Sequence, residues 1–178
     1  MEQKNSGYKK TRLLMVLIAV AALFGACSPY NVLEESVPLT KSLSYNDVYI
    51  GWLDYEEDNW KKFGYESQHQ WTVVVNEMNV KGLGIWLKEW MAGKNVDHAK
   101  KRDYEEPSKG LYVKFSDCVL WDYGAYAEVT LEYIDVSTKE TLYKSRIGIS
   151  AAQGWNFENS LNNLTYNIAL YINSQINI

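Results

Sequence analysis

The first 26 residues divide the chain into a leader and a part that is free to fold. Residues 13–26 carry no charge and are almost wholly apolar, and Lys9, Lys10 and Arg12 precede them. A transmembrane helix needs about 20 apolar residues to cross the hydrocarbon core of a bilayer, so a run of about 14 residues is too short. A basic segment followed by a short apolar run and small residues is typical of a cleaved export signal. We therefore expect residues 1–26 to be removed and to take no part in the fold.

The apolar run ends in Phe24-Gly25-Ala26-Cys27. Small residues before the cut let the backbone enter a peptidase groove, and the Cys27 thiol is an acceptor for a diacylglyceryl group. The segment resembles the lipobox of bacterial lipoproteins, which usually begins with Leu where this chain has Phe24. This resemblance implies cleavage between Ala26 and Cys27 and lipidation of Cys27. Two alternatives stay open: an ordinary secretory signal with a chance cysteine at the cut, and an uncleaved anchor.

The resemblance also implies where the mature chain lies. A lipoprotein of this type carries two or three acyl chains, and more than one chain is what stable anchoring requires. Ser28 follows the cysteine, in place of the Asp that commonly retains lipoproteins in the inner membrane of enteric bacteria. We therefore expect an outer-membrane protein, on the periplasmic side or at the cell surface. Residues 27–45, with two prolines and a glutamate pair, predict a tether, and residues 46–178 predict a single globular domain.

The cysteine count and the net charge narrow the class of protein. The chain has two cysteines; if a lipid occupies Cys27, Cys118 cannot form an internal disulfide, and we expect the domain to be held together by packing alone. Cys118 lies in an apolar segment without a basic neighbour, which favours a buried hydrophobic role over a nucleophilic one. Removing residues 1–26 changes the formal net charge from −4 to about −7. An acidic domain is a poor candidate for binding nucleic acid, which requires clustered Lys and Arg.

The first half of the domain predicts one strand and one helix. Residues 46–54 are nearly all apolar, as in a strand buried on both faces. Residues 67–91 repeat apolar side chains at steps of three and four and begin with Ser67 as a potential cap, which predicts a helix. Gly82 and Gly84 each cost about 1 kcal/mol against Ala inside a helix, so a break or a partial strand stays open; if the helix holds, we expect them to pack closely on the sheet. Its apolar stripe predicts core positions for Trp71, Trp86 and Trp90.

The second half predicts three strands and a final helix. Residues 111–115 alternate apolar and polar, and a continuation to Trp121 stays open. Residues 125–134 and 141–149 predict a hairpin joined by a turn, with one face in water. We expect oppositely charged side chains to pair across that face, namely Glu128 and Glu132 with Lys144 and Arg146. A helix capped by Asn156 ends the domain.

The order β-α-β-β-β-α predicts an α+β (α/β-like) domain, with a small mixed, largely antiparallel sheet of about four strands packed against two helices. The buried first strand, the helix ending near Gly93-Lys94, the strand pair joined by residues 135–141 and the terminal amphipathic helix resemble the domain shared by the N-terminal part of TolB and CsgG-like outer-membrane lipoproteins. This resemblance implies a binding or assembly role in the envelope and no catalysis.

The sequence offers no motif for catalysis, a metal or a cofactor. His69 and His98 do not have metal-ligand spacing, and we expect both at the surface. No nucleophile motif occurs in a strand–turn–helix context. Aromatic residues stand out instead, with seven Trp and 14 Tyr. Trp121, Tyr123 and Tyr126 flank a glycine turn, and we expect them to be exposed as candidate contacts for a ligand or partner.

Three functions follow from these observations. The first is a non-catalytic envelope lipoprotein, anchored to the membrane by lipid, that binds a protein partner or helps to assemble an envelope complex. The second is a glycan- or small-ligand-binding lipoprotein that uses the aromatic residues around Trp121. The third is a hydrolase, which requires His98, an Asp or Cys118 to meet in one cleft.

Overall fold

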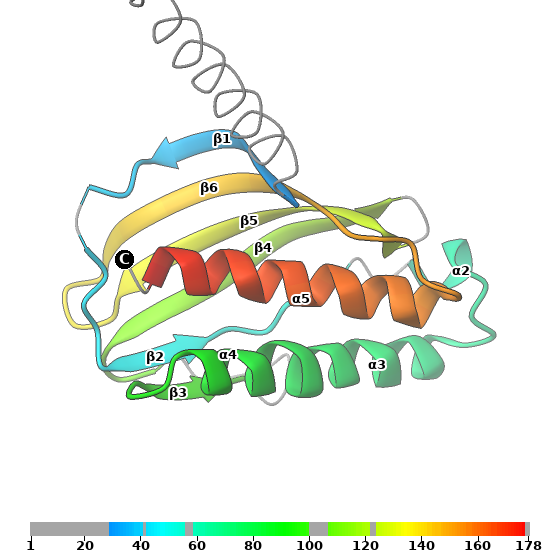
Figure 1. Ribbon diagram of the computed structural model, residues 1–178, viewed down its shortest axis with the longest axis horizontal. Helices are drawn as coiled ribbons and strands as arrows, with labels where there is room; N and C mark the ends of the chain where they lie inside the picture. The colour runs from blue at the N-terminus through cyan, green and yellow to red at the C-terminus, as the bar shows by residue number, and fades with distance from the viewer. Residues whose placement is uncertain (1–28, 41, 56–58, 100–106, 122–123, 177–178) are drawn as a thin grey trace, which may run out of the picture.

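The computed structural model describes residues 29–40, 42–55, 59–99, 107–121 and 124–176 of the protein. A six-stranded mixed sheet is covered on one face by helices, which confirms the α+β class but shows two strands more than expected (Figure 1). The strands are β1 (Tyr30–Val37), β2 (Asp47–Ile50), β3 (Asn95–His98), β4 (Leu111–Trp121), β5 (Tyr126–Asp135) and β6 (Glu140–Ser150). The helical segments are α2 (Asn59–Lys62), α3 (Gln68–Glu77), the π-helical η1 (Met78–Gly84), α4 (Ile85–Trp90) and α5 (Phe157–Ile176).

The sheet has the order β1-β6-β5-β4-β2-β3. The pairs β1–β6, β6–β5 and β5–β4 are antiparallel, whereas β2 is parallel to both β3 and β4. The predicted hairpin of β5 and β6 is present, and the predicted strand at residues 111–115 continues to Trp121 across a bulge, where Asp117 has a φ of 50°. A bulge leaves extra residues of one strand without a partner, so the pairing of β4 with β5 shifts its register between Ser116 and Val119.

The strand count was wrong at both edges of the sheet. Tyr30–Val37, which we expected within a tether, forms β1 and pairs with β6. Asn95–His98 forms β3 beside β2. Both are edge strands, with only one neighbour to set their side-chain pattern, and six consecutive residues of β1 are exposed on both faces. β1 therefore lacks the alternation that marks a half-buried strand, and β3 alternates in burial but has a single aliphatic residue, Val96, to show it in the sequence.

The predicted helix at residues 67–91 is present, and its weak point is a π-helix. Helices α3, η1 and α4 follow one another without a break from Gln68 to Trp90, and Ser67 caps the start by accepting from Gln70 N at 3.4 Å. The glycines Gly82 and Gly84 fall in η1. A π-helical turn inserts an extra residue, which shifts the buried face of the helix by part of a turn. The glycines thus mark a change of register within a continuous helix.

The two glycines pack against different partners. A Cβ on Gly82 would lie 2.8 Å from the Thr165 methyl group of α5, and a Cβ on Gly84 would lie 3.4 Å from the His98 ring of β3. The expectation of close packing on the sheet therefore holds for Gly84, whereas Gly82 brings two helices together. Leaving out a side chain is the simplest way for two backbones to approach.

Asn79 satisfies the backbone where the π-helix meets the sheet. Its side chain is fully buried, accepts from Leu53 N at 2.8 Å and donates to the carbonyl oxygens of Leu53 at 2.8 Å and Val75 at 2.9 Å. Leu53 follows β2 and is itself buried. Buried backbone groups that leave a ladder need partners, and one amide side chain provides them here for both groups of Leu53.

The last helix lies against the sheet as expected. Asn156 caps α5, with its Oδ1 accepting from Asn159 N at 2.9 Å. The buried stripe of α5 packs on the inner face of the sheet and beside η1, and the helix runs along the strands in Figure 1. None of the described helices is both long and apolar enough to cross a bilayer.

Asn79→Ala tests the bridge between the helix and the sheet. The substitution leaves the buried N–H and C=O of Leu53 without partners, so we expect the free energy of unfolding to fall by about 2–4 kcal/mol. Urea denaturation measures this change. The matched control is Asn76→Ala, one turn earlier and exposed, for which we expect a change within about 0.5 kcal/mol. Equal effects of the two substitutions would contradict the role given to Asn79.

Candidate functional site

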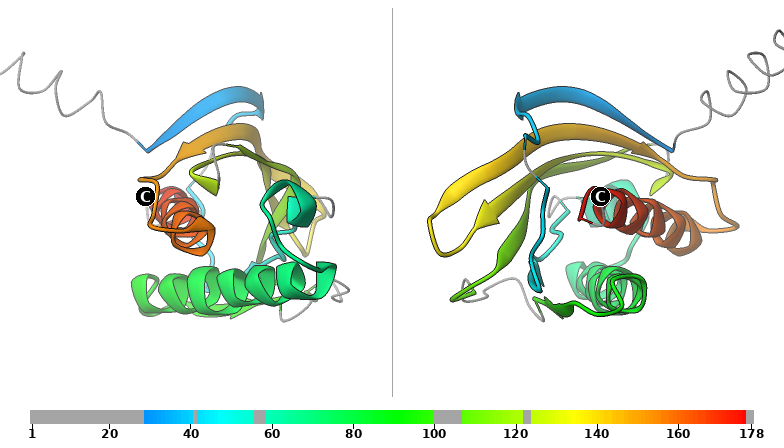
Figure 2. Two further views of the ribbon diagram at one scale, coloured as in Figure 1. Left: turned by 90° about the vertical axis from the view of Figure 1, so that its right-hand side faces the viewer. Right: turned by 60° about the vertical axis from the view of Figure 1, so that its left-hand side comes forward.

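One face of the sheet is left open to solvent. Figure 2 shows α5 and the long helix on the same side of the sheet, with no described helix over the opposite side. The burial of β5 follows this arrangement, because Ala127, Val129 and Leu131 are buried while Glu128, Thr130 and Glu132 are half-buried. We call this surface the open face; it consists of the outward side chains of β4, β5 and β6.

Charged pairs occupy the middle of the open face, as expected from the sequence. Arg146 donates through Nε and Nη2 to one carboxylate oxygen of Glu128, at 2.9 and 2.7 Å. Lys144 Nζ lies 3.8 Å from a Glu132 oxygen, and Thr141 donates to the other Glu132 oxygen at 2.7 Å. Two donors on one oxygen hold the Arg146 side chain in place, whereas the Lys144 pair has a longer distance and its lysine is more exposed.

Aromatic side chains occupy the end of the open face where β4 turns into β5. Trp121 and Tyr126 are paired across the hairpin, with ring centroids 5.7 Å apart. The Tyr126 ring extends over Gly148 of β6, where a Cβ would lie 2.6 Å from the phenol oxygen, and that hydroxyl donates to Glu128 at 3.3 Å. Both rings are half-buried, whereas we expected them to be exposed, because each packs against the other. Tyr126 connects this aromatic pair with the charged pairs through Glu128.

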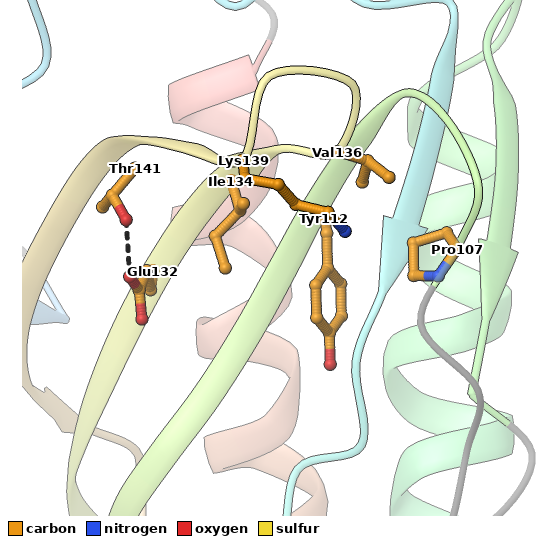
Figure 3. Close-up of a pocket in the computed structure, with 7 residues that line it drawn as sticks. All are labelled: Pro107, Tyr112, Glu132, Ile134, Val136, Lys139 and Thr141. Carbon is orange, nitrogen blue, oxygen red and sulfur yellow. Dashed lines mark hydrogen bonds between the residues drawn. The ribbon is translucent and has the colours of Figure 1, made fainter.

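A small pocket lies at the other end of the open face. It has a volume of about 240 Å³ and is lined by Pro107, Tyr112, Glu132, Ile134, Val136, Lys139 and Thr141 (Figure 3). The Tyr112 ring forms one wall, and Ile134 points into the same space from the neighbouring strand. An aromatic wall beside Glu132, Lys139 and Thr141 offers both an apolar surface and hydrogen-bonding groups.

Three other predicted site residues, Ala26, Cys27 and Tyr123, lie outside the described residues. The cleavage site and the lipidation of Cys27 therefore remain predictions. Among the described residues, no group of three or more His, Cys, Asp or Glu side chains is placed to hold a metal ion.

The expectation of a surface position was right for His69 and wrong for His98. His69 is exposed in the first turn of α3. His98 ends β3 with its ring turned toward Trp52 and Gly84, and only 7% of the residue is exposed. Burial, assisted by the charge of Lys88, lowers the pKa of His98 to about 4, although Asp97 opposes the shift. The imidazole is therefore neutral at ordinary pH.

Cys118 is buried, as expected from its apolar setting. It lies on β4 beside Tyr55, five residues beyond Val113. Val113 and His98 are both in register with Ile50 of β2, so Cys118 lies about 16 Å further along the strand direction than His98. A hydrolytic Cys–His pair needs the two side chains within hydrogen-bonding distance, and this geometry separates them.

From the sequence, we placed Trp86 and Trp90 wrongly in the core and did not single out Trp155. Trp71 is buried as expected, but Trp86 and Trp90 are half-buried and stack with centroids 6.3 Å apart, and Tyr166 of α5 meets both rings edge-on at 5.1 and 5.2 Å. Trp155, before α5, is fully exposed. Helical spacing places a residue on a stripe, but the width of the buried stripe depends on the neighbouring helix.

Comparison with known proteins finds no matching family model and no matching curated protein. Two solved structures resemble the chain over 82% of its length and 97% of theirs. One is the dodecamer of a point variant of PelC from Paraburkholderia phytofirmans, with 14% identity and a TM-score of 0.41. The other is the PelC dodecamer from the same organism, with 13% identity and a TM-score of 0.31. The resemblance to TolB and CsgG-like domains stays a prediction.

The buried His98 predicts a pH dependence of stability. The folded pKa of about 4 lies below the unfolded value near 6.5. Below pH 6.5 the unfolded chain therefore takes up the proton first, so stability is full above this pH and falls as the pH drops toward 4. Over the interval between the two pKa values, the free energy of unfolding falls by about 3 kcal/mol in total.

Urea denaturation between pH 4 and 7 measures this loss as a difference between variants. We expect His98→Phe to flatten the curve relative to the wild type, while His69→Gln leaves it unchanged because His69 is exposed. Parallel curves for His98→Phe and the wild type would show that His98 does not determine the pH dependence.

Proposed function

We propose that the protein is an envelope lipoprotein, anchored to the outer membrane through Cys27, whose domain binds a protein partner and performs no catalysis. The observation that carries this proposal is the open face, a sheet surface that no described helix covers. The acyl chains predicted at Cys27 would by themselves hold the domain at the membrane, so that anchoring would not require an apolar surface on the domain.

The chemistry of the open face suits a protein partner. Tyr, Trp and Arg are the residues that most often dominate binding energy at interfaces. Here Trp121 packs against Tyr126, and Tyr126 and Arg146 both donate to Glu128. Preformed side chains lose little conformational freedom when a partner binds, which lowers the cost of association.

The pocket at Tyr112 favours a second candidate, the binding of a glycan or another small ligand. Its aromatic wall and mixed polar lining suit the apolar face and hydroxyl groups of a sugar. Its volume of about 240 Å³ lies below the range of about 300–1,000 Å³ that is usual for small-molecule sites. For this reason we place the protein partner first.

Acylation of Cys27 is the first test. When the full chain is produced in a Gram-negative host, we expect the mature protein to begin at Cys27 and to carry two or three acyl chains, seen as added mass on the N-terminal peptide. Cys27→Ala should abolish both the acyl mass and this cleavage, because the thiol is the acceptor. A mature chain with an unmodified Cys27 would show an ordinary secretory signal instead.

Crosslinking in membranes tests the open face. We expect the tagged, lipidated protein to enrich a specific envelope protein, and the double variant Tyr126→Ala with Arg146→Ala to reduce this enrichment at least tenfold, since each side chain is a typical hot-spot residue. The control is Asn162→Ala, which is exposed on α5, across the sheet from the open face.

The outcomes separate the two candidate functions. Equal capture by the double variant and the control would show that the open face is not the interface, and no enriched protein under any growth condition would count against a partner. Binding of a glycan that is lost in Tyr112→Ala would favour the second candidate.

A further inference from the structure

The loop between β6 and α5 is held firmly against the helix. Asn167 donates to the carbonyl oxygen of Ser150 at 2.7 Å, and Asn163 donates to that of Ala152 at 3.0 Å. The Ser160 hydroxyl accepts from Gly154 N at 2.9 Å. Residues 150–156 carry no charged side chain. Polar side chains of α5 thus fix the path of an uncharged loop.

This loop presents Trp155 to the outside. Gly154 lies so close to α5 that a Cβ there would be 2.4 Å from Asn159 Cβ, and Asn156 caps the helix. The two neighbours of Trp155 are therefore fixed, yet Trp155 itself is 101% exposed and lies outside the core. A fully exposed Trp is unusual, because this side chain is highly buried on average.

The same loop lies next to the predicted lipid anchor. Ser150 N donates to the carbonyl oxygen of Pro29 at 2.7 Å. Cys27 precedes Pro29 by two residues, and a chain of two residues spans at most about 7 Å. The start of β1 and the loop from β6 to α5 lie on one side of the molecule in the right-hand view of Figure 2. Acyl chains on Cys27 would therefore bring this side to the bilayer.

Trp155 matches the chemistry of a bilayer surface. The indole ring combines a large apolar area with an N–H donor, and Trp is enriched at the boundary between hydrocarbon and water. An uncharged loop can approach the head groups without removing a charge from water. The β4–β5 hairpin lies beside it, because Ala151 N donates to the carbonyl oxygen of Ala125 at 2.8 Å.

We propose that Trp155 inserts into the interfacial region of the phospholipid bilayer that holds Cys27. This inference rests on the proposed lipid anchor. A lipid on one residue leaves a domain free to swing and rotate, whereas a second contact at Trp155 fixes one side of the domain to the membrane. The open face is then presented to a partner in a defined orientation.

Quenching of tryptophan fluorescence by brominated phospholipids tests the insertion. The lipidated full-length protein is reconstituted into phosphatidylcholine vesicles with or without bromine on the acyl chains near the head group. With seven Trp in the chain, we expect the brominated lipid to quench on the order of one seventh of the emission. Trp155→Ala should remove most of this quenching, and Trp155→Tyr should leave the protein folded with the same melting temperature.

The matched control is Trp86→Phe, which removes a half-buried ring from the helix layer and should leave the quenching by brominated lipid unchanged. Equal quenching of wild type and Trp155→Ala would overturn the proposal. So would a Trp155 that is shielded from aqueous iodide but not quenched by brominated lipid, because a protein would then cover it. The acyl mass on Cys27 is measured on the same sample: without it the proposed anchor fails too, and with it only the insertion is at stake.

Discussion

Burial of one face of the sheet under two helices is the interaction on which the rest of the structure depends. Cys118 is buried without a disulfide, so apolar packing has to hold the domain together. The buried cluster runs from Val113 and Leu131 in the sheet to Leu164 and Ile168 in α5. Because side chains alternate along a strand, filling this face commits the opposite residues to the open face. The polar surface that we assign to binding is therefore a direct consequence of the core.

A second constraint acts where the long helix meets the short parallel strands. The helix contacts α5 at Gly82, β3 at Gly84 and the Leu53 backbone through Asn79. All three residues lie in the π-helical η1, where the register of the helix shifts. The hydrogen bonds from Asn79 to Leu53 then compensate for the end of β2. Packing and hydrogen bonding are satisfied together at this point.

The end of the molecule near the start of β1 combines the features on which the proposed membrane contacts rest. The pairing of Pro29 with Ser150 connects the first described residue of the chain to the loop before α5, and α5 fixes that loop through asparagine side chains. The open face extends away along the strands from Trp121 to Tyr112. The proposed anchor and the proposed binding surface thus belong to different parts of a single sheet, so that the anchor would orient the binding surface.

The sequence by itself determined the parts of this protein that depend on local periodicity. The alternation in β5 and β6 predicted the hairpin and the charged pairs across it, and the spacing in residues 67–91 predicted the long helix, because a period of two or of 3.6 residues appears wherever one side of an element is buried. Only the tertiary structure decided β1, β3, the depth of His98 and the exposure of Trp86 and Trp155. β1 is exposed along six consecutive residues and β3 has one aliphatic residue in four, so neither edge strand has a clear period in the sequence. The environments of His98, Trp86 and Trp155 depend on segments that are distant in the chain, which local spacing does not record.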